Sequence, residues 1–244
     1  MTTRQRKVCV QMPSSRTTPA AILFDLDDTL NDRWSSIQHY TRIFLAQFHP
    51  RLTTKDWAES AAAIRRADQG GYRPKSEIFS ELRRTLPWHE APTVGELTDH
   101  WREHFPQAIQ VRAHARDILE TLQRHGLALG LVTNGNIAGQ GQKIDRLGLR
   151  AFFQVIVISE EVGVAKPDPA IFHHAVNLLG TLASETWFVG DNPINDIRGA
   201  AGAGLKPIWL RGIHPWPADF PEPEAQIDSL DQLLPMLSLP RRAK

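Results

Sequence analysis

The sequence predicts an α/β protein with a doubly wound parallel sheet and a small α-helical domain inserted into it. Three observations support this fold class. Short apolar runs recur along the chain without polar alternation, which is typical of strands covered on both faces. Helical patterns separate most of these runs, and strands that alternate with helices build βαβ units. One connection, after the first run, is far too long for a single helix.

The expected strands are short and mostly apolar. The third, V-I-V-I-S, is rich in β-branched residues, which favour strands. A Pro-rich stretch follows the fifth strand and predicts a surface loop, after which Ile227 is expected to begin a short edge strand. The five main strands are expected at residues 20–24, 127–132, 155–159, 187–190 and 207–210.

Helices are expected between and after these strands. The first three end beside Gly126, Gly148 and Gly180, and glycine is the usual residue just beyond a helix C-terminus. Ser229 is a suitable N-cap for the last helix. The expected ranges are 113–125, 140–147, 169–179, 195–203 and 230–237.

The connection after the first strand contains only helical patterns. The pattern at 33–48 places Trp34, Ile37, Phe44 and Phe48 along one face, as in an amphipathic helix. We therefore expect a helical cap domain at residues 31–109, inserted in a catalytic core formed by 20–30 and 110–244. This position predicts a cap over the carboxyl end of the first strand, where open α/β sheets bind ligands. Its helices are expected at 33–48, 54–67, 75–86 and 94–105.

Composition is that of an ordinary globular protein, with 41% hydrophobic and 23% charged residues in a chain of 244. The net charge of +1 gives no reason to expect nucleic acid or an anionic membrane as partner. A single cysteine, Cys9, excludes an internal disulfide and fits a reducing cytoplasm. No apolar run is long enough to span a membrane. Residues 1–19 are polar and free of acidic residues, so we expect a disordered tail, with an organelle transit peptide as the alternative.

Polar side chains follow four of the expected strands. In a parallel sheet the carboxyl ends of the strands lie on one edge, so these side chains are expected to converge. Several are carboxylates, and no cysteine or histidine cluster accompanies them, which suits Mg²⁺. The convergent residues are Asp25 and Asp27, then Thr133 and Asn134, then Lys166, then Asp191 and Asp196.

This set of groups also suits phosphoryl chemistry. A hydroxyl, an amide and a lysine supply hydrogen-bond donors and positive charge to a phosphoryl group. One carboxylate that attacks phosphorus forms an aspartyl-phosphate. A second, two residues further on, can protonate the leaving oxygen and later activate water.

The motifs F-D-L-D-D-T-L, L-V-T-N-G, K-P-D-P and V-G-D-N-P-I-N-D resemble those of the haloacid dehalogenase-like (HAD) hydrolase superfamily. All four occur in order, and the resemblance covers residues 20 to about 212. It is closest to the subgroup with a helical cap after the first strand, which implies a Rossmann-like core.

The resemblance implies a role for each motif residue. Asp28 receives no catalytic role, because many members have glycine at that position. Mg²⁺ is expected to be held by Asp25, by the backbone carbonyl of Asp27 and by Asp191, with Asp196 supporting the metal site. The implied roles are nucleophile for Asp25, general acid and base for Asp27, phosphate-binding hydroxyl for Thr133 with Asn134 beside it, and steadying of the nucleophile and phosphoryl group for Lys166.

The prediction is therefore a cytoplasmic, Mg²⁺-dependent phosphatase, a phosphoric monoester hydrolase, of a small phosphorylated metabolite. A 2-haloacid dehalogenase is an alternative, although that branch replaces the acid that Asp27 provides here. A sugar-phosphate mutase with the same site stays open. A receiver-type signalling domain would also be phosphorylated on aspartate, but it has no long insert and no acid two residues on. A catalytically idle binding protein would not need the complete set of groups.

Overall fold

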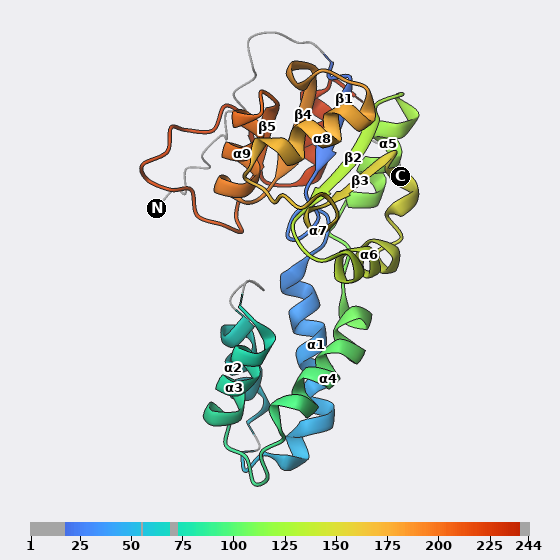
Figure 1. Cartoon of the computed structure of the whole chain (residues 1–244). Helices are drawn as coiled ribbons and strands as arrows, with labels where there is room; N and C mark the ends of the chain where they lie inside the picture. Colours follow the sequence, from blue (N-terminus) through green and yellow to red (C-terminus); the bar gives the residue numbers. More distant parts are fainter. Residues whose placement is uncertain (1–17, 55, 69–72, 240–244) are drawn as a thin grey trace, which may run out of the picture. The chain divides into compact units, whose positions relative to one another are not determined.

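The computed structural model describes residues 18–54, 56–68 and 73–239 (Figure 1). The tail expected at residues 1–19 therefore lies almost entirely outside the described residues. The chain forms two compact units, here named the core unit and the insert unit. The domain boundaries expected from the sequence stay a prediction. Among the described residues, the core unit comprises 18–30, 112–140 and 149–239, and the insert unit comprises 31–54, 56–68, 73–111 and 141–148.

A six-stranded sheet forms the centre of the core unit, in the order β3-β2-β1-β4-β5-β6. Every neighbouring pair is parallel. This arrangement confirms the predicted fold class, including the short edge strand at Ile227. The strands are β1 (Ala21–Phe24), β2 (Ala128–Thr133), β3 (Val155–Ile158), β4 (Thr186–Gly190), β5 (Lys206–Leu210) and β6 (Gln226–Ile227).

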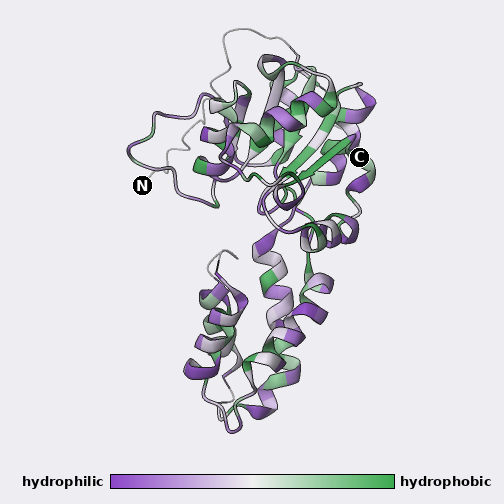
Figure 2. Cartoon of the chain, viewed as in Figure 1, coloured by the Kyte–Doolittle hydropathy of each residue, from purple (hydrophilic) through white to green (hydrophobic). Residues whose placement is uncertain are grey.

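The central strand β1 is buried along its whole length, which explains why its sequence does not alternate between apolar and polar residues. Helices α8 (Pro169–Leu179) and α9 (Gly199–Gly202) pack in front of the sheet (Figure 1). Phe172 of α8 joins Leu23 and Phe188 in one hydrophobic cluster. The strands are accordingly the most hydrophobic ribbons of this unit (Figure 2).

Most of the helices predicted for the core unit lie close to their expected positions. The helix expected at 195–203 instead begins as a π-helix, η5 (Pro193–Arg198), which α9 continues. The N–H of Ile197 donates to the carbonyl of Asn192, and this wider turn replaces the expected regular one. The remaining segments are α5 (Ala115–Arg124), α7 (Ser159–Val162), α10 (Leu233–Met236) and the 3₁₀ turns η3 (Arg150–Phe152), η4 (Ala183–Glu185) and η6 (Leu230–Gln232). Helix α6 (Ile137–Arg146) begins in the core unit and ends in the insert unit.

The insertion after β1 is helical, as predicted. Its core is aromatic: Tyr40, Phe44 and Phe48 of α1 pack with Phe105 of α4. Trp34, which was expected on this apolar face, is instead 60% exposed, with the guanidinium of Arg65 over its ring. The helices are α1 (Arg33–Phe48), α2 (Trp57–Asp68), α3 (Lys75–Thr85) and α4 (Val94–Ala108), and the 3₁₀ turn η1 (His49–Arg51) follows α1.

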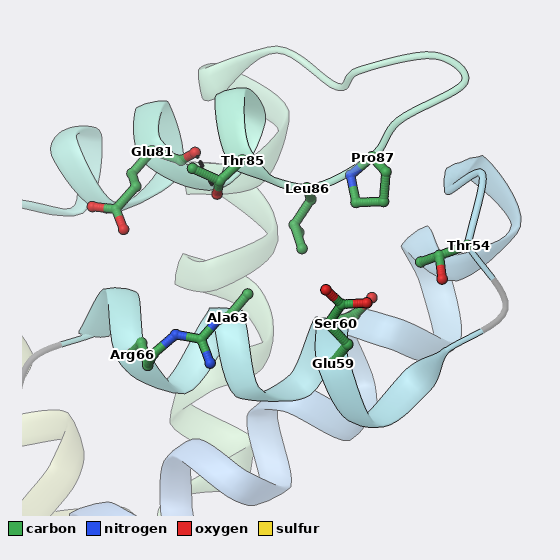
Figure 3. Close-up of a pocket in the computed structure, with 9 residues that line it drawn as sticks. All are labelled: Thr54, Glu59, Ser60, Ala63, Arg66, Glu81, Thr85, Leu86 and Pro87. Carbon is green, nitrogen blue, oxygen red and sulfur yellow. Dashed lines mark hydrogen bonds between the residues drawn. The ribbon is translucent and has the colours of Figure 1, made fainter.

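A polar pocket of about 270 Å³ lies between α2 and α3 of the insert unit (Figure 3). Leu86 and Ala63 line it together with the charged residues Glu59, Arg66 and Glu81. Separately, no helix in the described part of the chain combines the length and apolarity needed to cross a membrane.

Candidate active site

The candidate site lies at the carboxyl ends of the three central strands. Asp25 directly follows β1, Thr133 is the last residue of β2, and Asp191 directly follows β4. The direction in which strands are added reverses at β1, since β2 lies on one side and β4 on the other. Such a switch point is where open α/β sheets bind ligands.

Lys166 joins two of the predicted acidic residues. Its Nζ lies 2.5 Å from Oδ1 of Asp25 and 2.7 Å from Oδ1 of Asp196. All three side chains are buried. Burial alone would lower the pKa of Lys166, but the carboxylates of Asp196 and Asp25 outweigh it and raise that pKa above its ordinary value. Lys166 is therefore a fixed positive charge against the expected nucleophile.

Asp25, Asp191 and Asp196 form a buried carboxylate group. One oxygen from each lies within 4.8 Å of the others. Burial raises the pKa of Asp25 to about 7, with Lys166 opposing and Asp196 adding to the shift. Burial also raises the pKa of Asp191, and the charges of Asp25 and Asp196 add to it. A divalent cation would offset this repulsion, and oxygen-only ligands suit Mg²⁺.

Asp196 reaches this group because residue 190 is glycine. A Cβ at Gly190 would lie 2.5 Å from side-chain atoms of Asp196. The other oxygen of Asp196, Oδ2, accepts a hydrogen bond of 2.9 Å from the N–H of Asn192. Asn192 caps the helical turn, because its side chain accepts from the N–H groups of Ile194 and Asn195. Because Asn192 provides the cap, Oδ1 of Asp196 is available to accept a hydrogen bond from Lys166.

Asn134 holds the segment that carries Lys166. Its Nδ2 donates to the carbonyl of Lys166 at 2.9 Å, and its Oδ1 accepts from the N–H of Lys166 at 2.8 Å. This paired contact fixes the lysine backbone beside β2. The phosphate-binding role expected for Asn134 stays a prediction, and the structure adds this positioning contact.

Thr133 and Asp27 share a neighbour that sequence reasoning did not identify. The side-chain amide of Gln140 contacts Oγ1 of Thr133 and Oδ2 of Asp27. Gln140 is buried together with Ile144 and Leu147. These three residues are spaced i, i+4 and i+7, as on the buried face of a helix. A glutamine in a position where an apolar residue is expected was the sequence signal that could have identified Gln140.

Three further residues contact Asp191. Thr29 donates from Oγ1 to Oδ1 at 3.0 Å, and Trp209 donates from Nε1 to the backbone carbonyl at 2.9 Å. His214 Nε2 lies 3.3 Å from Oδ2. Thr29 belongs to the first motif and could have been found there. His214 lies in the Pro-rich loop, where no sequence pattern indicated it.

Asp28 has a different role from its two acidic neighbours. Its φ is 63°, a left-handed conformation that asparagine and aspartate adopt more readily than most residues. Its backbone carbonyl accepts a hydrogen bond of 2.6 Å from Nη2 of Arg112. Asp28 thus forms the turn after the first motif.

Comparison with known proteins identifies the family. Residues 22–210 match the haloacid dehalogenase-like hydrolase family. The chain belongs to this family, as the four motifs indicated.

Individual relatives of the chain include proteins of two activities. A glyceraldehyde 3-phosphate phosphatase of Methanopyrus kandleri is 32% identical over 203 residues, which cover 78% of this chain and 83% of the relative. The structure of YfnB from Bacillus subtilis, bound to magnesium, has a TM-score of 0.71 and covers 91% of this chain and 100% of that one; at 24% identity it shows the fold alone. A 2-haloacid dehalogenase of Pseudomonas syringae pv. Tomato has a TM-score of 0.57 and 30% identity, and covers 90% of this chain and 98% of that one.

Proposed function

We propose that this protein is a Mg²⁺-dependent phosphatase of a small phosphorylated metabolite and acts through an aspartyl-phosphate. The observation that carries the proposal is the placement of Lys166 between Asp25 and Asp196, with Asp191 in the same buried group. The phosphatase relative from Methanopyrus kandleri supports the same chemistry. We retain cytoplasmic location and the absence of nucleic-acid and membrane partners as expectations.

In the first step, a carboxylate oxygen of Asp25 attacks phosphorus, and the bond from phosphorus to the leaving oxygen breaks. Asp27 gives its proton to that oxygen, so the product leaves as an alcohol. Lys166 neutralises charge beside Asp25, and the hydroxyl of Thr133 donates to a phosphoryl oxygen. Asp25, the backbone carbonyl of Asp27 and Asp191 would hold Mg²⁺, with Asp196 supporting the metal site. The ion would supply positive charge to the phosphoryl oxygens when bound.

In the second step, water attacks phosphorus and the bond from phosphorus to Asp25 breaks. Asp27, now a carboxylate, takes a proton from the water. Inorganic phosphate leaves, and both aspartates return to their starting states. One acid therefore serves both halves of the reaction.

The dehalogenase structure from Pseudomonas syringae makes 2-haloacid dehalogenation the second candidate. A halide leaves without a proton, so that reaction would give Asp27 no role in the first step. The presence of an aspartate at position 27 therefore favours the phosphatase. A sugar-phosphate mutase needs the same site and a retained bisphosphate, and product analysis separates it from a hydrolase.

The proposal is tested by assaying purified protein with p-nitrophenyl phosphate and a panel of phosphorylated metabolites. Turnover should require Mg²⁺, stop with EDTA and release inorganic phosphate. Asp25→Asn should abolish turnover while circular dichroism shows an intact fold. Metal-independent release of halide from a 2-haloacid, without phosphatase activity, would establish the dehalogenase instead.

A further inference from the structure

Gln140 occupies an unusual position for a polar side chain. It lies in the first turn of α6, directly after the T-N-G motif, and is only 3% exposed. Its Nε2 lies 3.0 Å from Oδ2 of Asp27, 2.5 Å from Oγ1 of Thr133 and 3.0 Å from the carbonyl of Asn134. One buried amide group thus touches both the expected acid and the expected phosphate-binding hydroxyl.

The glycine of the T-N-G motif makes room for this side chain. A Cβ at Gly135 would lie 2.8 Å from Cγ and 3.0 Å from Cδ of Gln140. Gly135 also has a φ of 146°, which side-chain-bearing residues rarely adopt. The loop between β2 and α6 is therefore shaped around the glutamine.

We propose that Gln140 is a positioning residue that sets the proton positions of Asp27 and Thr133. The inference rests on the proposed function. An amide nitrogen can only donate and carries two hydrogens. Oδ2 of Asp27, Oγ1 of Thr133 and the carbonyl of Asn134 therefore all accept from it, and one hydrogen is shared between two of these acceptors. The acid proton of Asp27 is then held on Oδ1, and the hydroxyl hydrogen of Thr133 is available for a phosphoryl oxygen.

This arrangement matters for the proton given to the leaving oxygen. As the bond from phosphorus to that oxygen breaks, the proton moves from Oδ1 of Asp27 to the oxygen. The carboxylate left behind is stabilised by the N–H of Gln140 at Oδ2, because hydrogen bonds to charged acceptors are stronger than those to neutral ones. Gln140 itself neither gains nor loses a proton.

The test compares two aryl phosphates of similar shape that need the acid to different degrees. Phenolate is a strong base and leaves poorly without a proton, whereas p-nitrophenolate leaves readily. Gln140→Met keeps the length of the side chain and removes its donor. It should lower kcat/KM for phenyl phosphate by about 10-fold or more, and for p-nitrophenyl phosphate by no more than about 2-fold.

A matched control lies on the same helix. Gln142 is exposed, and Gln142→Met should leave both kcat/KM values unchanged. Gln140→Glu, which places an acceptor against Asp27, should lower the value for phenyl phosphate at least as much as Gln140→Met. In an Asp27→Asn background, adding Gln140→Met should leave the ratio of the two kcat/KM values unchanged, because the acid is already lost.

Equal losses on the two substrates in Gln140→Met, with melting temperature unchanged, would overturn the inference and leave the proposed function standing. So would the same selective loss in Gln142→Met. A wild-type protein that hydrolyses neither aryl phosphate nor any phosphorylated metabolite of the panel with Mg²⁺ would overturn the proposed function, and this inference with it.

Discussion

The absence of a single Cβ atom at Gly190 allows the side chain of Asp196 to lie beside the other carboxylates of the site. Gly190 ends β4, and the space that a methyl group would fill there belongs to the side chain of Asp196. Gly135 makes the corresponding space for Gln140. Two glycines in motif positions are therefore explained by what lies against them rather than by loop flexibility.

The first prediction concerns the glycine at the end of β4. Gly190→Ala should displace Asp196 from Lys166 and lower Mg²⁺-dependent turnover or Mg²⁺ affinity at least about 10-fold, as for other residues that orient metal ligands. Steady-state kinetics over a range of Mg²⁺ concentrations measures this. Gly202→Ala is the control, because a Cβ there meets nothing within 4 Å. Similar kinetics in the two variants would contradict the explanation.

At the scale of helices, the insert unit is held together by α1 against α4. Tyr40 of α1 hydrogen-bonds Nδ1 of His100 of α4 at 3.0 Å, inside the aromatic core. Burial lowers the pKa of His100 to about 4, and the neighbouring ring of His104 adds to the shift. His100 is therefore neutral in the folded protein at neutral pH.

This histidine gives the second prediction. Between its ordinary pKa of about 6.5 and its folded pKa of about 4, the unfolded chain takes up a proton that the folded chain does not. Stability is thus fully present above about pH 6.5 and falls as the pH drops towards 4. Urea unfolding of wild type and His100→Phe from pH 4 to 7 should show a smaller loss in the variant. A loss of stability in His100→Phe as large as that of wild type over this range would contradict this account.

Much of the element pattern was predictable because it depends on local periodicity. Helices α1 and α8 occupy the predicted ranges, and the strands differ from prediction by a residue or so. The π-turn after Asn192 was not predictable, because it depends on Asn192 capping the turn while Asp196 bonds Lys166 across the sheet. Trp34 was wrongly expected on the buried face of α1, because helical spacing does not show how far along the helix the apolar face is covered by other helices. Gln140 escaped notice because its partners come from two other segments of the chain.

For the molecule as a whole, the buried carboxylate group is a stability cost that bound Mg²⁺ should offset. A ligand that binds only the folded state raises stability, so saturating Mg²⁺ should raise the melting temperature of wild type by about 5 °C or more. Asp191→Asn removes one of the repelling charges. This variant should melt above wild type in EDTA and show little response to Mg²⁺, as measured by differential scanning calorimetry. A wild-type melting temperature that is independent of Mg²⁺ would contradict this account.

The strand order also has a consequence for how the chain folds as it is synthesised. Strand β1 leaves the ribosome first, but its neighbours β2 and β4 begin at Ala128 and Thr186. Strand β1 therefore has no neighbour to pair with until about half of the 244 residues have been made, and it gains its second neighbour only when β4 follows. Such non-local pairing is slow to form. The helices of the insertion pack against one another within residues 31–111, so they can fold before β1 pairs with its neighbours. Early truncation of the chain would leave an apolar strand exposed, a species prone to aggregate and in need of chaperones.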